Sequence, residues 1–350
     1  MTARGSGGLL VCAGLLLAAP ALAATPADVG ECAASADKAE IGDAACSRII
    51  DDASASAAQR VEAFKNRGRL AFEARDYDRA IADYGEAIKL SPKDVWAYAR
   101  RGMAWTETGE FDRAIADLTE AVTIDPKYAF GFGQRGQARF RKRLITKKGG
   151  WEAAIADYSE AIRLDPDLLW LYSSRGVAYS NDRQYDLAIV DCGEVIRRDP
   201  KNSAGYNCRG VALEGFRDYR HAISDYDQSI QINPKNGVAY WNRGNAHLAL
   251  RKVDNAISDY DRAIAINPKD FNAFNSRGKA WVAKRDSSRA IEDFTQAIQR
   301  DPSYVEAYNN RGLSYLVLQR RSDAIADFRK AQSIDPADQT SRQQLRVLGF

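Results

Sequence analysis

The dipeptide Arg-Gly recurs at a fixed spacing through most of this chain. Its glycines lie 34 residues apart, except for one interval of 40: Gly68, Gly102, Gly136, Gly176, Gly210, Gly244, Gly278 and Gly312. Eight of the ten prolines keep the same spacing, from Pro92 to Pro336. A fixed period of this length indicates one supersecondary unit that is repeated and stacked. Function is therefore expected on the surface of the stack.

The repeated unit is predicted to be a pair of helices. In residues 97–125, apolar and small residues spaced three and four apart mark one helical face before Gly109 and a second face after it. Asp125-Pro126 ends the second helix, because proline cannot continue a helix. Every unit has alanine followed by isoleucine in the second helix, and the alanines are Ala80, Ala114, Ala154, Ala188, Ala222, Ala256, Ala290 and Ala324. These small residues are expected where the two helices approach closely.

This pattern resembles the tetratricopeptide repeat family, which has a 34-residue period and an aromatic, glycine, alanine and proline signature. The aromatic residues four before the glycines are Phe64, Tyr98, Phe132, Tyr172, Tyr206, Tyr240, Phe274 and Tyr308. The match covers roughly residues 61–336. The resemblance implies an all-α, right-handed superhelical solenoid of eight antiparallel helix pairs. It also implies that the first helix of each pair faces a concave, partner-binding surface, and it supplies no catalytic residues.

The ends of the repeat array are expected to be covered. Residues 24–60 do not fit the repeat and are predicted to form an N-terminal cap, while residues 337–350 are predicted to form a C-terminal capping helix. The single long interval places six extra residues within 141–150, a segment rich in Lys and Arg. This segment could dock an acidic partner or a lipid head group. A solvated loop with a lengthened helix end is the favoured interpretation.

Residues 1–23 are predicted to be a secretory signal. A positive start is followed by an apolar run from Leu9 to Ala19, and Ala21-Leu22-Ala23 fits a cleavage site. The mature chain is therefore expected in the periplasm or secreted, with membrane contact only through this segment before cleavage.

Four cysteines remain after such cleavage, and an even number in an oxidising compartment indicates two disulfides. Four cysteines allow three connectivities, and the prediction is Cys32 with Cys46 and Cys192 with Cys208. Four free buried thiols are the alternative.

An arginine precedes each repeat glycine, and an aspartate is equally regular in the second helix. The aspartates are Asp83, Asp117, Asp157, Asp191, Asp225, Asp259, Asp293 and Asp327. This regularity predicts a structural role, in which each arginine bridges the aspartates of two neighbouring units. A row of catalytic acids is not expected, because each acid has an arginine to neutralise it.

The sequence contains few residues suited to a catalytic or cofactor site. Only two histidines are present, His221 and His247, and no metal-ligand cluster or phosphate-binding loop is found. The net charge of +3 lacks a dominant basic block, so nucleic acid is not the implied partner. We expect no enzymatic activity, no cofactor, no metal and no small-molecule substrate.

The partner-binding surface is predicted on a stripe of the first helices away from the core face. The stripe comprises the positions six and three residues before each glycine and one and five after it. Its candidate contact residues are Trp96, Phe130, Trp170, Asn207, Trp241, Asn245, Asn275 and Asn309. Aromatic residues there would anchor a partner, and amides would pair with an extended peptide backbone. The alternative is that some of them pack against neighbouring first helices.

These features predict a non-enzymatic, exported interaction scaffold that binds a protein or peptide partner. A structural component of the cell envelope that assembles with itself is the alternative.

Overall fold

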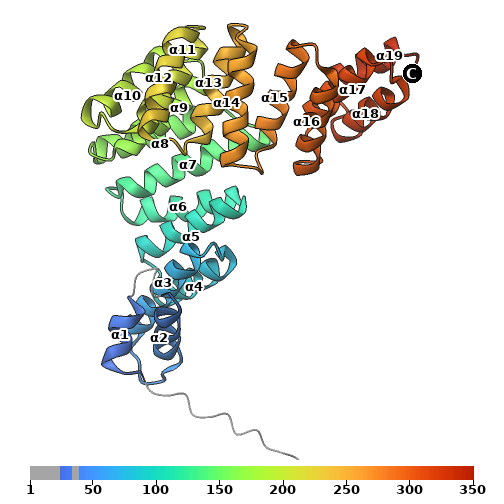
Figure 1. Ribbon diagram of the computed structural model, residues 1–350. Coiled ribbons are helices and arrows are strands. Elements are labelled where there is room, and N and C mark those ends of the chain that lie inside the picture. Colours follow the sequence, from blue (N-terminus) through green and yellow to red (C-terminus); the bar gives the residue numbers. More distant parts are fainter. Residues whose placement is uncertain (1–23, 34–38) are drawn as a thin grey trace, which may run out of the picture. The chain divides into compact units, whose positions relative to one another are not determined.

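The computed structural model describes residues 24–33 and 39–350, and the expected signal segment 1–23 lies outside the described residues. The described residues form 19 helices and no strand (Figure 1). The helices are α1 (Pro26–Cys32), α2 (Ala39–Asp51), α3 (Ala57–Glu73), α4 (Tyr77–Leu90), α5 (Val95–Thr108), α6 (Phe111–Ile124), α7 (Ala129–Thr146), α8 (Glu152–Leu164), α9 (Leu169–Asn181), α10 (Tyr185–Arg198), α11 (Ser203–Gly215), α12 (Tyr219–Ile232), α13 (Gly237–Ala249), α14 (Val253–Ile266), α15 (Phe271–Ala283), α16 (Ser287–Arg300), α17 (Val305–Val317), α18 (Arg321–Ile334) and α19 (Gln339–Val347).

The chain divides into two compact parts, each of which is described by itself. The N-terminal part, up to Pro126, holds α1, α2 and the first two repeats, α3–α4 and α5–α6. The C-terminal part, from Lys127, holds six repeats, α7–α8 to α17–α18, followed by α19. Within each part, every helix packs on the next one along the chain. The expected all-α stack of helix pairs is confirmed.

Small residues allow the two helices of a repeat to touch. The Ala80 position of every second helix is almost completely buried. A Cβ at Gly68 would lie 2.8 Å from the ring of Tyr84, so only glycine lets this second-helix ring rest on the first helix. Equivalent large side chains, such as Leu118 and Phe294, are fully buried in other repeats. The core is therefore distributed along the stack, one layer for each repeat.

The turn inside most repeats closes with a residue in the left-handed backbone conformation. Gly109 has φ 84° in the second repeat, and its turn is closed by hydrogen bonds from Gly109 N–H to Thr106 and from Glu110 N–H to Trp105. This pair of bonds is the Schellman ending of a helix, in which glycine is the usual residue. Other repeats place non-glycine residues there: Arg75, Lys147, Arg183, Arg217, Arg251, Arg285 and Gln319.

The repeated arginine and aspartate pair within each repeat, but the expected ladder of shared aspartates is wrong. Arg243 binds Asp259 of its own repeat through Nε at 3.0 Å and Nη2 at 2.6 Å. Its third contact crosses to the preceding repeat and reaches Asp227, two residues after the repeated aspartate. The same position provides Ser159 for Arg175. In both repeats the contact across the repeat boundary is made by the residue two positions after the repeated aspartate.

The two ends of the stack are covered by helices outside the repeats. Arg79 of α4 forms an ion pair with Asp43 of α2 at 2.7 Å, and Arg67 of α3 donates to Ser47 of α2 at 3.0 Å. At the other end, Leu345 of α19 is buried in one cluster with Phe328 of α18. These contacts cover apolar surfaces that a further repeat would otherwise cover.

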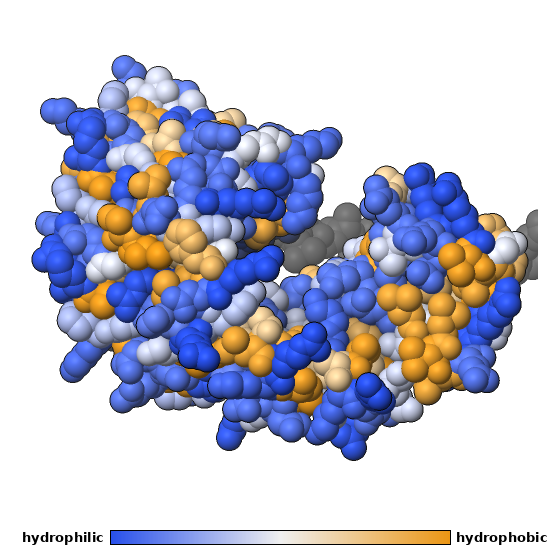
Figure 2. All heavy atoms as spheres, turned by 90° about the horizontal axis from the view of Figure 1, so that it is seen from above, coloured by the Kyte–Doolittle hydropathy of each residue, from blue (hydrophilic) through white to orange (hydrophobic). Residues whose placement is uncertain are grey.

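The extra residues of the third repeat lengthen its first helix. Helix α7 continues to Thr146, and residues 147–151 connect it to α8. Among the described residues, no helix combines the length and apolar character needed to cross a bilayer. In the space-filling view, apolar side chains form separate patches divided by hydrophilic ones (Figure 2).

Candidate pocket on the first-helix face

First helices lie next to one another in the C-terminal part. Each of α7, α9, α11, α13 and α15 contacts the following first helix, the last of which is α17, as well as its own second helix. Their shared surface is called the first-helix face below. Asn207, Trp241, Asn245 and Asn275 come from α11, α13 and α15 of this face.

The aromatic candidates take part in packing, which corrects the expectation that they lie away from the core. Trp170 is half-buried against a buried cluster, and a Cβ at Gly133 would lie 2.6 Å from its ring. Phe130 meets the Trp170 ring edge-on, with centroids 6.4 Å apart. In the N-terminal part, Trp96 lies edge-on to buried Tyr84 at 5.7 Å. These rings fill space between consecutive helices.

The polar candidates are also engaged with the next repeat. Trp241 donates from Nε1 to Ser276 Oγ at 2.9 Å. Asn275 and Asn309 are buried, with 2% and 6% of their surface exposed, so the expectation that they are open to a partner is wrong. Asn309 donates to Asp338, which holds the start of α19. These side chains join neighbouring repeats.

Asn207 and Asn245 remain half-buried with a donor group to spare. Asn207 accepts through Oδ1 from Asn242, and Asn245 accepts through Oδ1 from the Tyr260 hydroxyl at 2.8 Å. An amide carries two N–H donors as well as its oxygen. Both Nδ2 groups can therefore donate to carbonyl oxygens of a ligand.

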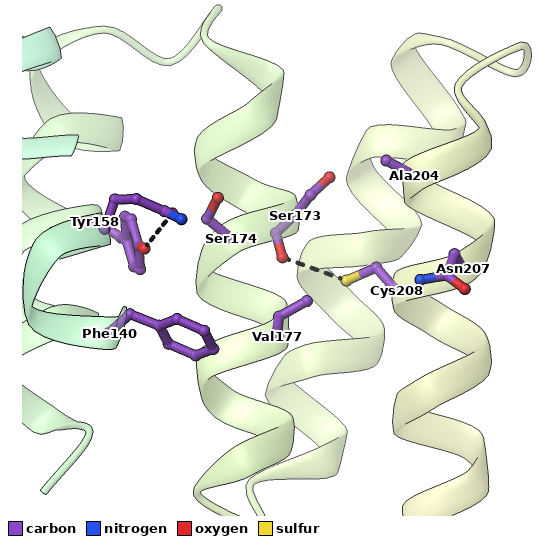
Figure 3. A pocket seen from close by; sticks show the side chains of 9 residues that line it. Phe140, Tyr158, Ser173, Ser174, Val177, Ala204, Asn207 and Cys208 are labelled. Carbon is purple, nitrogen blue, oxygen red and sulfur yellow. Dashed lines mark hydrogen bonds between the residues drawn. The ribbon is translucent and has the colours of Figure 1, made fainter. Parts of the chain in front are cut away.

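A pocket of about 260 Å³ opens beside Asn207, between α7, α9 and α11 (Figure 3). Its lining combines apolar and polar side chains: Gln137, Phe140, Tyr158, Ser173, Ser174, Val177, Ala204, Asn207 and Cys208. The Tyr158 hydroxyl donates to Gln137 Oε1 at 3.1 Å. Burial raises the pKa of Tyr158 well above its usual value, so the phenol stays protonated and neutral. The pocket thus offers hydroxyl and amide groups around an apolar floor.

One small residue explains the pocket. Ala204 lies six residues before its repeat glycine, at the position that holds Trp96, Phe130 and Trp170 in the three preceding repeats. Trp170 fills the space beside Gly133 on the preceding first helix. An alanine in α11 cannot reach back in this way, so space remains beside Ser173, the residue that corresponds to Gly133.

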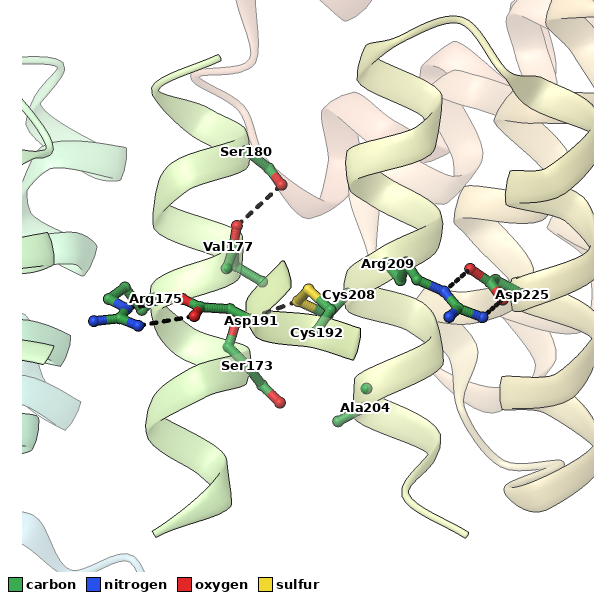
Figure 4. The surroundings of a disulfide bond; sticks show 12 residues. Ser173, Arg175, Val177, Ser180, Asp191, Cys192, Ala204, Cys208, Arg209 and Asp225 are labelled. Atoms are coloured by element: carbon green, nitrogen blue, oxygen red, sulfur yellow. Dashed lines mark hydrogen bonds and ion pairs between the residues drawn. A yellow bond between two sulfur atoms is a disulfide. The ribbon is translucent and has the colours of Figure 1, made fainter. Parts of the chain in front are cut away.

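Cys208 connects the pocket to the C-terminal cysteine pair (Figure 4). The structure joins Cys192 of α10 to Cys208 of α11 with their Cα atoms 5.7 Å apart, and it joins Cys32 to Cys46 with Cα atoms 4.7 Å apart. Both distances are within the range of disulfides. Cys192 occupies the position of Tyr158 and Tyr226 in the adjacent repeats, and a Cβ at Gly176 would lie 2.8 Å from both sulfur atoms. The sulfur pair therefore fills the layer that a large ring fills elsewhere.

Reactive groups are sparse near this pocket. No group of three His, Cys, Asp or Glu side chains suited to a metal ion occurs in the part of the chain that the structure describes. His247 is buried beneath the first-helix face with Nε2 3.8 Å from Asp259, and burial lowers its pKa. The arrangement is suited to hydrogen bonding and to apolar contact.

Comparison with known proteins agrees with the repeat geometry. Models described as tetratricopeptide repeat match residues 65–129, 276–339 and 238–270, and one described as TPR repeat matches residues 144–182. The chain belongs to the tetratricopeptide repeat family. No curated protein matches this tetratricopeptide repeat chain.

Three solved structures show the range of similarity to this chain. A tetratricopeptide repeat protein from Parabacteroides merdae has 17% identity and a TM-score of 0.61, and the match covers 73% of this chain and 99% of that one. MamA from Desulfovibrio magneticus has 19% identity and a TM-score of 0.44, with coverage of 49% and 98%. YrrB, described as a TPR protein with an unusual peptide-binding site, has 18% identity and a TM-score of 0.43, with coverage of 54% and 97%.

Sequence reasoning missed most of the pocket of this tetratricopeptide repeat protein. It selected large aromatic and amide residues, whereas the pocket exists because Ala204 is small and Ser173 and Ser174 leave space. The signal was present, since Ala204 breaks a run of three aromatic residues at one repeat position.

Proposed function

We propose that this chain is a non-enzymatic, exported scaffold that binds a peptide segment of a partner protein on the first-helix face of its C-terminal part. The family presents its first helices as a partner-binding surface, which supports the general role. Export is supported by two cysteine pairs at disulfide distance, because such bonds persist in oxidising compartments.

The pocket beside Asn207 is the observation that carries this proposal. Its volume of about 260 Å³ suits one large side chain of a ligand, and Phe140 and Val177 provide apolar contact. The Nδ2 groups of Asn207 and Asn245 suit the carbonyl groups of an extended backbone. Recognition would then combine one anchored side chain with hydrogen bonds to the peptide chain.

Filling the pocket provides a direct test. A displayed random peptide library is selected against the chain from Ala24 onwards, which contains every described helix, and the affinity of the selected peptide is measured by fluorescence polarisation. Ala204→Trp would place in α11 the ring that Trp170 provides in α9. We expect it to keep the melting temperature and to weaken binding at least about tenfold, since a pocket anchor contributes roughly 2 kcal/mol or more.

Val190→Trp is the control, because Val190 lies on the second helix α10, is 67% exposed and does not line the pocket. It should leave peptide affinity unchanged. Equal loss of affinity in both variants, or none in Ala204→Trp, would contradict binding in this pocket. Sedimentation of the unliganded chain tests the alternative of self-assembly, for which the mass would rise with concentration.

A further inference from the structure

Arginine occupies a strained position in consecutive turns of the C-terminal part. Arg183, Arg217, Arg251 and Arg285 have φ values between 58° and 64°, a region that favours glycine. They follow the first helices α9, α11, α13 and α15, one in each repeat. Gly109 shows that the same turn forms with glycine. Four repeats in a row therefore retain a basic side chain where glycine would be less strained, and strain that is retained in this way points to a function.

These four arginines have no role in holding the turns together through their side chains. All four are exposed, and within the described residues none of the guanidinium groups has an ion-pair partner. The acidic residues of the same turns contact groups other than these arginines. Asp182 accepts from the Gln184 amide, Asp218 and Asp286 accept from the backbone N–H groups of His221 and Arg289, and Asp254 pairs with Lys284 at 2.6 Å. Because the first helices are neighbours, the arginines follow one edge of the C-terminal part, which we call the turn edge.

Apolar side chains are exposed along the turn edge between the charges. Phe216 precedes Arg217 and is 48% exposed, although one side of its ring packs on Tyr185. At the end of the lengthened helix α7, Ile145 is 63% exposed and precedes Lys147, which also has a left-handed φ. Leu318 is 41% exposed in the turn that follows α17.

We propose that the turn edge docks on an anionic lipid bilayer. Arginines in a row would contact lipid phosphates, and the interspersed Phe216, Ile145 and Leu318 would enter the interface between head groups and acyl chains. A soluble polyanion such as nucleic acid fits less well, because it would cover these apolar side chains with charged groups. This site is separate from the peptide pocket, and it differs from the sequence-based expectation that only the signal segment meets a membrane.

Glycine substitution tests the turn edge without damage to the fold. The chain from Ala24 onwards, which lacks the apolar signal segment, is mixed with vesicles of phosphatidylcholine with or without phosphatidylglycerol, and bound protein is measured by co-sedimentation. The variant carries Arg183→Gly, Arg217→Gly, Arg251→Gly and Arg285→Gly. Its melting temperature should be unchanged or higher, because glycine relieves the left-handed strain. Its partitioning to anionic vesicles should fall at least about tenfold, because each basic residue contributes to attraction at the surface.

Two further variants separate position from total charge. The matched control removes four exposed charges away from the turn edge through Lys201→Gln, Lys235→Gln, Lys269→Gln and Arg262→Gln, and it should bind anionic vesicles like the parent chain. Lysine at the four turn positions should also retain binding. Equal loss in the matched control, absence of binding to anionic vesicles, equal binding to neutral vesicles, or preference for a soluble polyanion over vesicles would each overturn the proposal.

Discussion

Asn242 donates from Nδ2 to Oδ1 of Asn207 across 3.0 Å and thereby joins the first helices α13 and α11. The two residues are 35 positions apart, which is one repeat plus one residue. Asn310 and Asn275 form the same bond at the same separation. Positions that resemble a peptide-binding row in sequence thus hold neighbouring repeats together, and among them Asn207 and Asn245 keep an Nδ2 group available to a ligand.

The packing role of the aromatic residues predicts that stability and binding respond to different substitutions. Trp170→Ala should lower the free energy of unfolding by about 2–4 kcal/mol, since it empties the space beside Gly133. Asn207→Ala should change it by only about 1 kcal/mol, because one hydrogen bond is lost. Urea unfolding and peptide affinity are measured on both variants. If Trp170→Ala unfolds like the parent chain but loses affinity, the ring is a partner anchor and the packing role is wrong.

The burial of each arginine–aspartate pair predicts how much stability is lost when its aspartate is replaced by alanine. Asp157 is 4% exposed and binds both Arg135 and Arg139, so Asp157→Ala leaves two arginines without their partner and should cost about 3–5 kcal/mol. Asp225→Ala should cost less, roughly 1–3 kcal/mol, because its partner Arg209 is 33% exposed.

Asp227 provides the control for this series. It binds Arg243 at a half-exposed position, and Asp227→Ala should cost under about 1 kcal/mol. Chemical denaturation of the three variants gives the order, and equal losses for Asp157→Ala and Asp227→Ala would refute a structural role for the repeated aspartate.

Oxidation of both cysteine pairs is a third prediction. Peptide mapping without reductant should recover Cys32 linked to Cys46 and Cys192 linked to Cys208. The pairs are separated by 14 and 16 residues, and closing loops of that length stabilises a protein by roughly 3 kcal/mol each in the chain-entropy model. Cys192→Ala with Cys208→Ala should therefore lower the melting temperature, and treatment with dithiothreitol should do the same to the parent chain. Free thiols in protein recovered from an oxidising compartment would contradict this.

Glu214 predicts a pH dependence of stability. Burial raises its pKa above the usual 4.5, although the Tyr226 hydroxyl donates to it at 3.0 Å. Burial therefore disfavours the carboxylate, and the protonated acid is the better-tolerated form in the folded state. Its contribution to stability is complete below the unfolded-state pKa and is lost as the pH rises through the higher folded-state pKa.

Glu214→Gln removes this titration and can still accept from Tyr226. Its stability relative to the parent chain should rise as the pH increases from about 4 to 7 in thermal melts. A constant difference across this range would show that Glu214 is well solvated in the folded protein.

The repeat made the fold predictable, whereas contacts between repeats were harder to foresee. The period predicted the helix pairs, the small residues where the two helices meet, and the pairing of Arg101 with Asp117. The partner of each arginine across repeats depends on how far one helix turns relative to the next. The sequence therefore did not reveal that Arg243 contacts Asp227 of the preceding repeat rather than the repeated aspartate Asp225.

The burial of the candidate contact residues could not be predicted from the sequence for a related reason. A helical wheel places Asn275 away from the core of its own repeat, but it contains no neighbouring helices. In the structure the Asn275 amide donates to Tyr304 and Glu306 of the next repeat, and these two residues cover it. The pocket likewise depends on a neighbouring helix, because Ala204 of α11 leaves the space beside Ser173 of α9 empty.

The bond between Cys192 and Cys208 has a consequence for this chain under tension. Each repeat contacts mainly its neighbours, so a force applied to the two ends would extend the stack in small steps. The 16-residue span between these cysteines would not extend, because its ends are tied 5.7 Å apart. The fully stretched oxidised chain would therefore be shorter by about 50 Å at this point than the reduced chain, and the fourth and fifth repeats would remain tethered after the rest had been pulled out.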